Sequence, residues 1–170
     1  QNIEHVVAFL DDEGRLGGFH FNDFHYADDD LTSGSIDPYR LFRILLAIVE
    51  AEARRGGDLD IEFMVDQSHN LKPKIEAMIQ TTTTVQELFA KALLVDLDAL
   101  ADARRRENIV DAEACLRDAF ATDVRPGLAA WRQARGLPGD PLVAHRDSGY
   151  EVRAAGDRRT RKSGSGGSYA

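Results

Sequence analysis

The sequence contains little cysteine and no long apolar run. Its single cysteine, Cys115, excludes an intrachain disulfide in a chain of 170 residues, so we expect a protein of a reducing compartment, the cytoplasm. No apolar stretch approaches the ~20 residues of a membrane-spanning helix, and no basic and apolar leader is found at the start. We therefore expect neither a membrane partner nor secretion.

Positive charge is also scarce over most of the chain. The net charge is −8, but residues 151–170 hold five basic residues against two acidic ones, so the first 150 residues carry about −11. An acidic body disfavours binding to a phosphate backbone, and we expect no nucleic acid partner. The last part of the basic segment is rich in glycine and serine, which predicts a disordered tail over residues 151–170.

Helix and strand patterns alternate in the first half of the chain. Apolar spacing predicts a helix over residues 3–14, and a short aromatic run predicts a strand over 19–22. An Asp-Pro pair opens a second helix over 37–55, which ends at two glycines. A second apolar run predicts a strand over 61–66. This alternation is typical of an α/β fold with a parallel sheet, which we assign to residues 1–72.

No strand pattern follows residue 73. The apolar spacing predicts five successive helices, over residues 75–79, 85–95, 99–105, 111–120 and 128–135. We assign residues 73–150 to a helical extension. Two strands are too few for a doubly wound sheet of about five or a barrel of eight, and both their edges would stay exposed. Since the chain also begins at Gln1 rather than at methionine, we expect a C-terminal part of a larger α/β protein.

Ionisable side chains gather where the predicted strands end. His20 lies in the first strand, Asp28 and Asp30 lie in the loop after it, and Asp66 closes the second strand. Functional groups of parallel α/β proteins collect at the carboxyl ends of strands. An imidazole and three carboxylates form an oxygen and nitrogen ligand set for Mn²⁺, Mg²⁺, Co²⁺ or Zn²⁺. The sequence therefore predicts a metal site or an acid–base site at this rim.

Each of these residues also has a plainer interpretation. Residues 28–30 could form a solvated acidic loop, because the glycine and distal glutamate of a calcium-binding loop are missing. His20, between two phenylalanines, could be a half-buried, hydrogen-bonded side chain, and Asp66 could cap the helix that follows. Ser68 and His69 are adjacent, but without an orienting acid or a glycine elbow they do not indicate a serine hydrolase.

Three motifs favour the metal site when they are taken together. They span residues 17–22, 26–31 and 66–70, and their order and spacing resemble the C-terminal part of the L-rhamnose isomerases, the broad-specificity bacterial type among the xylose-isomerase-like TIM barrels. The resemblance covers about residues 1–150. It implies that the two strands are the last two of the eight in a TIM (β/α)8 barrel. The helices after Pro73 would form an extension that packs beside the barrel and contributes to a homotetramer.

The resemblance also implies a reaction and a site. The family interconverts aldoses and ketoses, here L-rhamnose and L-rhamnulose, with two divalent cations, usually Mn²⁺. By this match His20 and Asp66 would bind the ion that holds the hydroxyl oxygens of the sugar, and Asp28 and Asp30 would bind the second, catalytic ion. Asp66 and Ser68 would orient a water or relay a proton. The family's other ligands, a glutamate, an aspartate and a histidine, would come from earlier strands.

Several alternatives stay open at this point. Gln67 and Asn70 could donate hydrogen bonds to the ligands. The substrate could be rhamnose, lyxose, mannose or allose. The chain could also belong to another sugar isomerase or epimerase of the same superfamily. A third interpretation is a helical interaction module without enzymatic activity, in which the acidic loop binds no metal.

Overall fold

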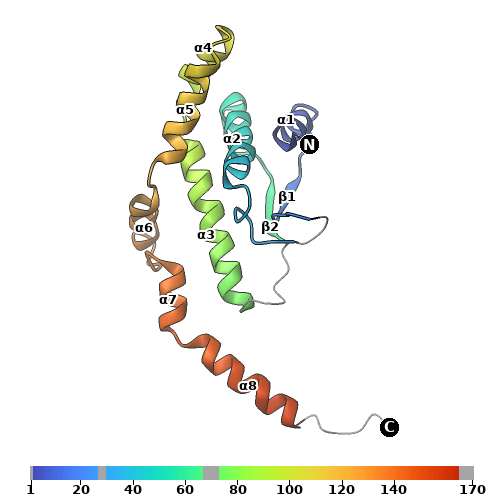
Figure 1. The fold of residues 1–170 in the computed structure, drawn as a ribbon, viewed down its shortest axis with the longest axis vertical. Helices are drawn as coiled ribbons and strands as arrows, with labels where there is room; N and C mark the ends of the chain where they lie inside the picture. The colour runs from blue at the N-terminus through green and yellow to red at the C-terminus, as the bar shows by residue number, and fades with distance from the viewer. Residues whose placement is uncertain (1, 27–29, 67–72, 165–170) are drawn as a thin grey trace, which may run out of the picture.

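Helices and two short strands follow one another along the chain (Figure 1). The structure is a computed structural model that describes residues 2–26, 30–66 and 73–164. Its elements are α1 (Ile3–Asp12), β1 (Gly18–Phe21), α2 (Pro38–Arg55), β2 (Glu62–Val65), α3 (Lys74–Leu93), α4 (Leu97–Arg105), α5 (Ile109–Ala121), α6 (Arg125–Gln133), α7 (Pro141–Asp147) and α8 (Tyr150–Gly164). The strands lie next to α2, whereas α6 and α7 lie beside α3, and α8 extends away from the strands (Figure 1).

Local signals in the sequence set both ends of α2. The side chain of Asp37 accepts a hydrogen bond from the backbone N–H of Arg40 at 2.9 Å, and Pro38 occupies the first helical position. The carboxylate accepts one of the free N–H groups of the first turn. Proline suits the first helical position because it has no N–H that would need a partner there. At the other end Gly56 adopts the left-handed region with φ 72°, which glycine tolerates at no steric cost. The helix predicted over residues 37–55 is confirmed.

The core lies between α2 and α3. Phe42, Leu45 and Ile48 of α2 are fully buried, and they share one apolar cluster with Leu88 and Ala92 of α3. Burying a large apolar side chain stabilises the fold by about 1.5–3 kcal/mol. This cluster therefore fixes α2, and the strands beside it, against the helical second half of the chain.

The two strands form a parallel pair with one apolar and one open face. Phe19 is aligned with Phe63, and His20 with Met64. The rings of Phe19, Phe21 and Phe63 stack at centroid distances of 5.5–5.9 Å, and Phe21 is buried in the cluster that contains α2. Because side chains alternate along a strand, His20 and Met64 project from the opposite face. There the Met64 residue is 50% exposed.

Helix α3 runs through the threonine tract of residues 81–84, where the sequence analysis predicts two helices over 75–79 and 85–95. That division is wrong. Three consecutive threonine hydroxyls donate to backbone carbonyls four residues earlier at 2.9 Å, those of Thr82, Thr83 and Thr84. Threonine has a low helix propensity, but these bonds satisfy the hydroxyls inside the helix. Thr81 is fully buried, so tertiary packing overrides the propensity.

The C-terminal segment also differs from its prediction. Residues 150–164 form helix α8, where the sequence analysis predicts a disordered tail over 151–170. The stretch before the final glycines and serines is rich in alanine and arginine, which are strong helix formers. The sequence analysis predicts no helix over residues 141–147, where the structure has α7. Its seven residues follow the N-cap Asp140, whose carboxylate accepts from two backbone N–H groups. No helix within the described ranges has the length and apolar character needed to cross a membrane.

One loop glycine offers a test of this packing. Gly34 has φ +74°, and a Cβ at this position would lie 2.8 Å from Cγ2 of Thr84 on α3. Gly34→Ala should therefore destabilise the fold by about 1–3 kcal/mol, which lowers the midpoint of thermal unfolding by roughly 2–10 °C. Gly57→Ala is the control, since nothing lies within 4 Å of its Cβ position. Equal midpoints for the two variants in circular dichroism melts would contradict the packing of this loop on α3.

Candidate functional site

His20 and Asp66 meet at the carboxyl end of the parallel strand pair. Nδ1 of His20 lies 3.5 Å from Oδ2 of Asp66. The strand ladder holds Asp66 in this place, because its backbone N–H donates to the carbonyl oxygen of Phe21 at 3.0 Å. The sequence predicts that these two side chains share one rim, and the structure brings them together.

This pair is open to solvent in the chain described here. The side chains of His20 and Asp66 are 63% and 61% exposed. Exposed ion pairs contribute about 0–1 kcal/mol to folding, so stability gives little reason to place an imidazole beside a carboxylate here. Neighbouring ligands of an octahedral ion with bonds of ~2.1 Å lie about 3 Å apart. The observed 3.5 Å separation is therefore close to what two ligands of one divalent ion require.

Asp30 lies at the end of the same loop that leaves β1. Its backbone adopts φ 42°, a region that aspartate tolerates better than most residues. Its Oδ1 accepts a hydrogen bond from Nδ2 of Asn22 at 3.0 Å. Since Asn22 directly follows β1, this bond ties the Asp30 carboxylate to the strand end that also carries His20.

The donor chemistry fits a divalent cation in part. Nitrogen and carboxylate oxygen donors from His20 and Asp66 suit Mn²⁺, Co²⁺, Zn²⁺ or Mg²⁺. However, among the residues that the structure describes, no three His, Cys, Asp or Glu side chains form a group that could hold a metal ion. Asp28 and Ser68, which the sequence analysis also assigns to the site, lie outside the described residues, as do Gln67 and Asn70.

Asp23 and Asn22 carry contacts that the sequence analysis did not anticipate. The carboxylate of Asp23 accepts three backbone N–H groups, from Phe24 at 3.2 Å, Ile36 at 2.9 Å and Asp37 at 3.3 Å. It also borders a cavity of about 340 Å³ that adjoins β1, α2 and the start of α1. The only signal in the sequence was an Asn-Asp pair directly after a strand, since its partners are 13 and 14 residues away.

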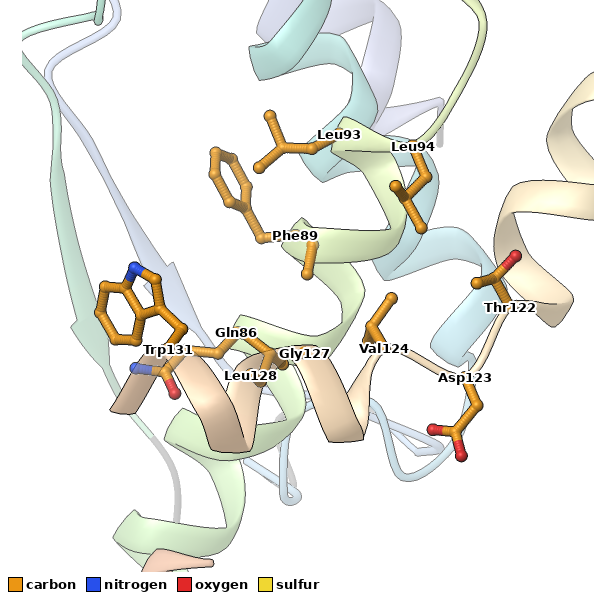
Figure 2. A pocket seen from close by; sticks show the side chains of 11 residues that line it. Gln86, Phe89, Leu93, Leu94, Thr122, Asp123, Val124, Gly127, Leu128 and Trp131 are labelled. Carbon is orange, nitrogen blue, oxygen red and sulfur yellow. The ribbon is translucent and has the colours of Figure 1, made fainter. Parts of the chain in front are cut away.

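A larger cavity lies elsewhere and does not carry this chemistry. It has a volume of about 590 Å³ and is formed by α3, α6 and the segment before α6. Figure 2 shows the apolar side chains around it, with Phe89 and Leu93 on α3 and Trp131 on α6. Its one carboxylate is Asp123, whose pKa is lowered to about 2 by hydrogen bonds from Arg125. Asp123 is therefore ionised at neutral pH and is no proton donor there.

The fold and the strand-end pair thus define an α/β unit with a candidate metal site at its carboxyl rim. Comparison with known proteins finds two similar chains. The chain is 44% identical over 166 residues to a "probable sugar isomerase" of Rhizobium meliloti (strain 1021). It is 43% identical, also over 166 residues, to a "probable sugar isomerase" of Mesorhizobium japonicum.

These matches cover 98% of the chain but only 39% of each relative, so the chain spans about two fifths of the length of these curated proteins. No family model matches it. Both relatives are named as sugar isomerases, and neither name specifies rhamnose as the substrate.

Proposed function

We propose that this chain is the C-terminal part of a metal-dependent aldose–ketose isomerase of the L-rhamnose isomerase type. The observation that carries the proposal is the pair of His20 and Asp66, 3.5 Å apart at the carboxyl ends of two parallel strands. Two further findings support it. The relatives are named as sugar isomerases, and the chain has the length of only part of them.

We propose separate metal-binding and proton-transfer roles for the residues of the chain. His20 and Asp66 would hold one cation, and Asp30 would contribute to a second, together with Asp28. Two such ions, when bound, polarise the oxygens on C1 and C2 of the sugar. Asp66 contacts His20 through Oδ2, and within the described ranges no hydrogen bond or ion pair engages its Oδ1. That oxygen could accept the hydroxyl proton of the sugar and return it.

The open surfaces of the strand pair support a barrel. Within the described residues β1 pairs with β2 on one edge and its other edge is unpaired. A cavity of about 340 Å³ adjoins β1. Ile3, Phe19 and Ile44 give it an apolar lining. Natural proteins rarely leave a strand edge and an apolar lining uncovered. We therefore propose that preceding strands of a TIM barrel pair with this edge and cover the face of His20 and Met64. The helices from α3 onward would form the extension, in a tetramer.

The test uses the longer protein that contains this chain. It should convert L-rhamnose to the ketose in the presence of Mn²⁺. Removing the metal with a chelator should reduce turnover at least ~10²-fold, because the ions stabilise the developing charge on the sugar oxygens, and added Mn²⁺ should restore it. Ketose formation is measured colorimetrically, with L-lyxose, D-mannose and D-allose assayed beside L-rhamnose.

The outcomes separate the alternatives. Metal-dependent turnover of another aldose, without turnover of L-rhamnose, would favour a different isomerase of the superfamily. Interconversion of two ketoses or two aldoses would indicate an epimerase. If the longer protein neither binds Mn²⁺ nor turns over any of these sugars, the proposal is wrong. The helical interaction module would then be the favoured interpretation.

A further inference from the structure

The loop after β1 is held by two neighbouring residues that have no assigned role. Asp23 pairs with Leu31 through both backbone groups, with N···O distances of 2.8 and 2.6 Å. This antiparallel bridge closes the loop and places Leu31, and with it Asp30, beside the end of β1. Asn22 then donates its side-chain hydrogen bond to Asp30 at 3.0 Å.

The side chain of Asp23 ties the same strand end to the start of α2. Its Oδ2 accepts the backbone N–H groups of Ile36 and Asp37, and its Oδ1 accepts that of Phe24. Asp37 is itself the N-cap of α2, and α2 carries the buried core. The loop is therefore anchored through Asp23 to the start of the helix that carries the buried core, rather than only to its own neighbours.

These contacts use Asp23 as an acceptor and not as a ligand. A carboxylate that receives three backbone N–H groups has both oxygens engaged, and moving it to a cation would break those bonds. Asp30 stands in the same loop, and its carboxylate accepts a hydrogen bond from the side chain of Asn22. Carboxylates that bind metals are commonly oriented by a hydrogen bond of this kind, and the loss of the orienting partner costs 10- to 100-fold in metal affinity or activity.

We propose that Asn22 and Asp23 are positioning residues that hold the Asp30 carboxylate at the carboxyl end of β1 for the second divalent ion. Asp23 fixes the path of the loop, and Asn22 fixes the orientation of the carboxylate. This inference rests on the proposed function, because it needs a protein that binds two ions. It adds residues that act through Asp30 and touch neither ion nor sugar.

Two variants of the longer protein test the inference. Asp23→Asn replaces one acceptor oxygen by an amide that donates, so at least one of the three N–H groups loses its partner. Asn22→Ala removes only the bond to Asp30 and alters an exposed side chain. In calorimetric Mn²⁺ titrations the affinity for the second ion should be about 10- to 100-fold lower in both variants. The ion held by His20 and Asp66 should keep its affinity within about three-fold.

A second measurement needs no metal. In the apo protein, hydrogen exchange at the backbone N–H groups of Ile36 and Asp37 should accelerate in Asp23→Asn and stay unchanged in Asn22→Ala. Asp37→Asn is the matched control, because it removes one negative charge from the same loop and keeps an N-cap acceptor. It should leave both Mn²⁺ affinities within about three-fold of the wild type.

The outcomes distinguish this inference from the proposed function. A wild-type protein that binds no Mn²⁺ would overturn both. A wild type that binds two ions, together with unchanged second-ion affinity in both variants, would overturn the positioning roles alone. If Asp23→Asn does not fold, the Asn22→Ala titration decides, because the exposed Asn22 side chain has no role in the core.

Discussion

Replacing Asp66 by asparagine in the longer protein is expected to lower kcat by ~10²-fold or more while the fold stays intact. The variant keeps the shape of the side chain and removes its negative charge, so one proposed ligand becomes a weak one. Losing a group that supports a metal ligand lowers metal affinity or activity by about 10- to 100-fold. Losing the charge of the ligand itself should lower activity by at least ~100-fold. Bound Mn²⁺ should fall in the same variant.

The fold should survive this change because Asp66 contributes little to stability. Its side chain is 61% exposed and forms an ion pair with the equally open His20, and exposed pairs are worth about 0–1 kcal/mol. The unfolding midpoint of Asp66→Asn should therefore stay within a few degrees of the wild type. A fall in activity without a fall in stability would separate a ligand from a structural carboxylate.

Asp60→Asn is the matched control for this experiment. It is the same substitution at an exposed position before the amino end of β2, about 20 Å along the strand direction from Asp66. Surface changes away from a site are usually within ±0.5 kcal/mol, so kcat should stay within about two-fold. Equal losses of activity in the two variants would contradict the ligand role of Asp66.

The strands and α2 could be predicted because their signals are local. The cap at Asp37, the proline behind it and the glycine at position 56 all lie within α2 or next to it. The two strands needed only short apolar runs with polar ends. Parallel pairing then follows from the helix between them, and with it the meeting of His20 and Asp66. Neither step requires knowledge of the rest of the molecule.

The helix boundaries in the second half depend on contacts that no local pattern records. Helix α3 continues through residues 81–84 because Thr81 is buried and the next three hydroxyls bond to the preceding turn. Helix propensity alone predicts that the helix is interrupted at these threonines. Asp23 was missed for a similar reason, since its role depends on N–H groups of Ile36 and Asp37. Hydrogen bonds between residues 13 and 14 positions apart depend on the folded path of the loop, so the sequence alone does not indicate them.

The chain of residues 1–170 by itself is expected to be inactive as an isomerase. In the described part of the chain, the candidate site brings two ionisable ligands together and no group of three. Both side chains are more than 60% exposed, so water competes at each ligand position. Holding a sugar for reaction needs a dry pocket and fixed geometry, and this chain offers an open strand face in their place.

The exposed surfaces predict a second property of the isolated chain. Phe63 and Met64 on β2 are 51% and 50% exposed, and within the described residues both outer edges of the strand pair are unpaired. Edges and apolar faces of this kind associate with other chains. Size-exclusion chromatography with light scattering should therefore show association or poor solubility, in contrast to a defined oligomer of the longer protein.

The decisive test assays residues 1–170 and the longer protein side by side with Mn²⁺ and L-rhamnose. We expect turnover of the isolated chain to be at least ~10³-fold lower, since positioning and water exclusion can each supply several kcal/mol of the barrier. A calorimetric titration should lack a two-ion isotherm in the micromolar range, because water would replace the ligands that other strands supply. Turnover within ten-fold of the longer protein would mean that two strands and their loops suffice for the reaction, and the barrel proposal would fall.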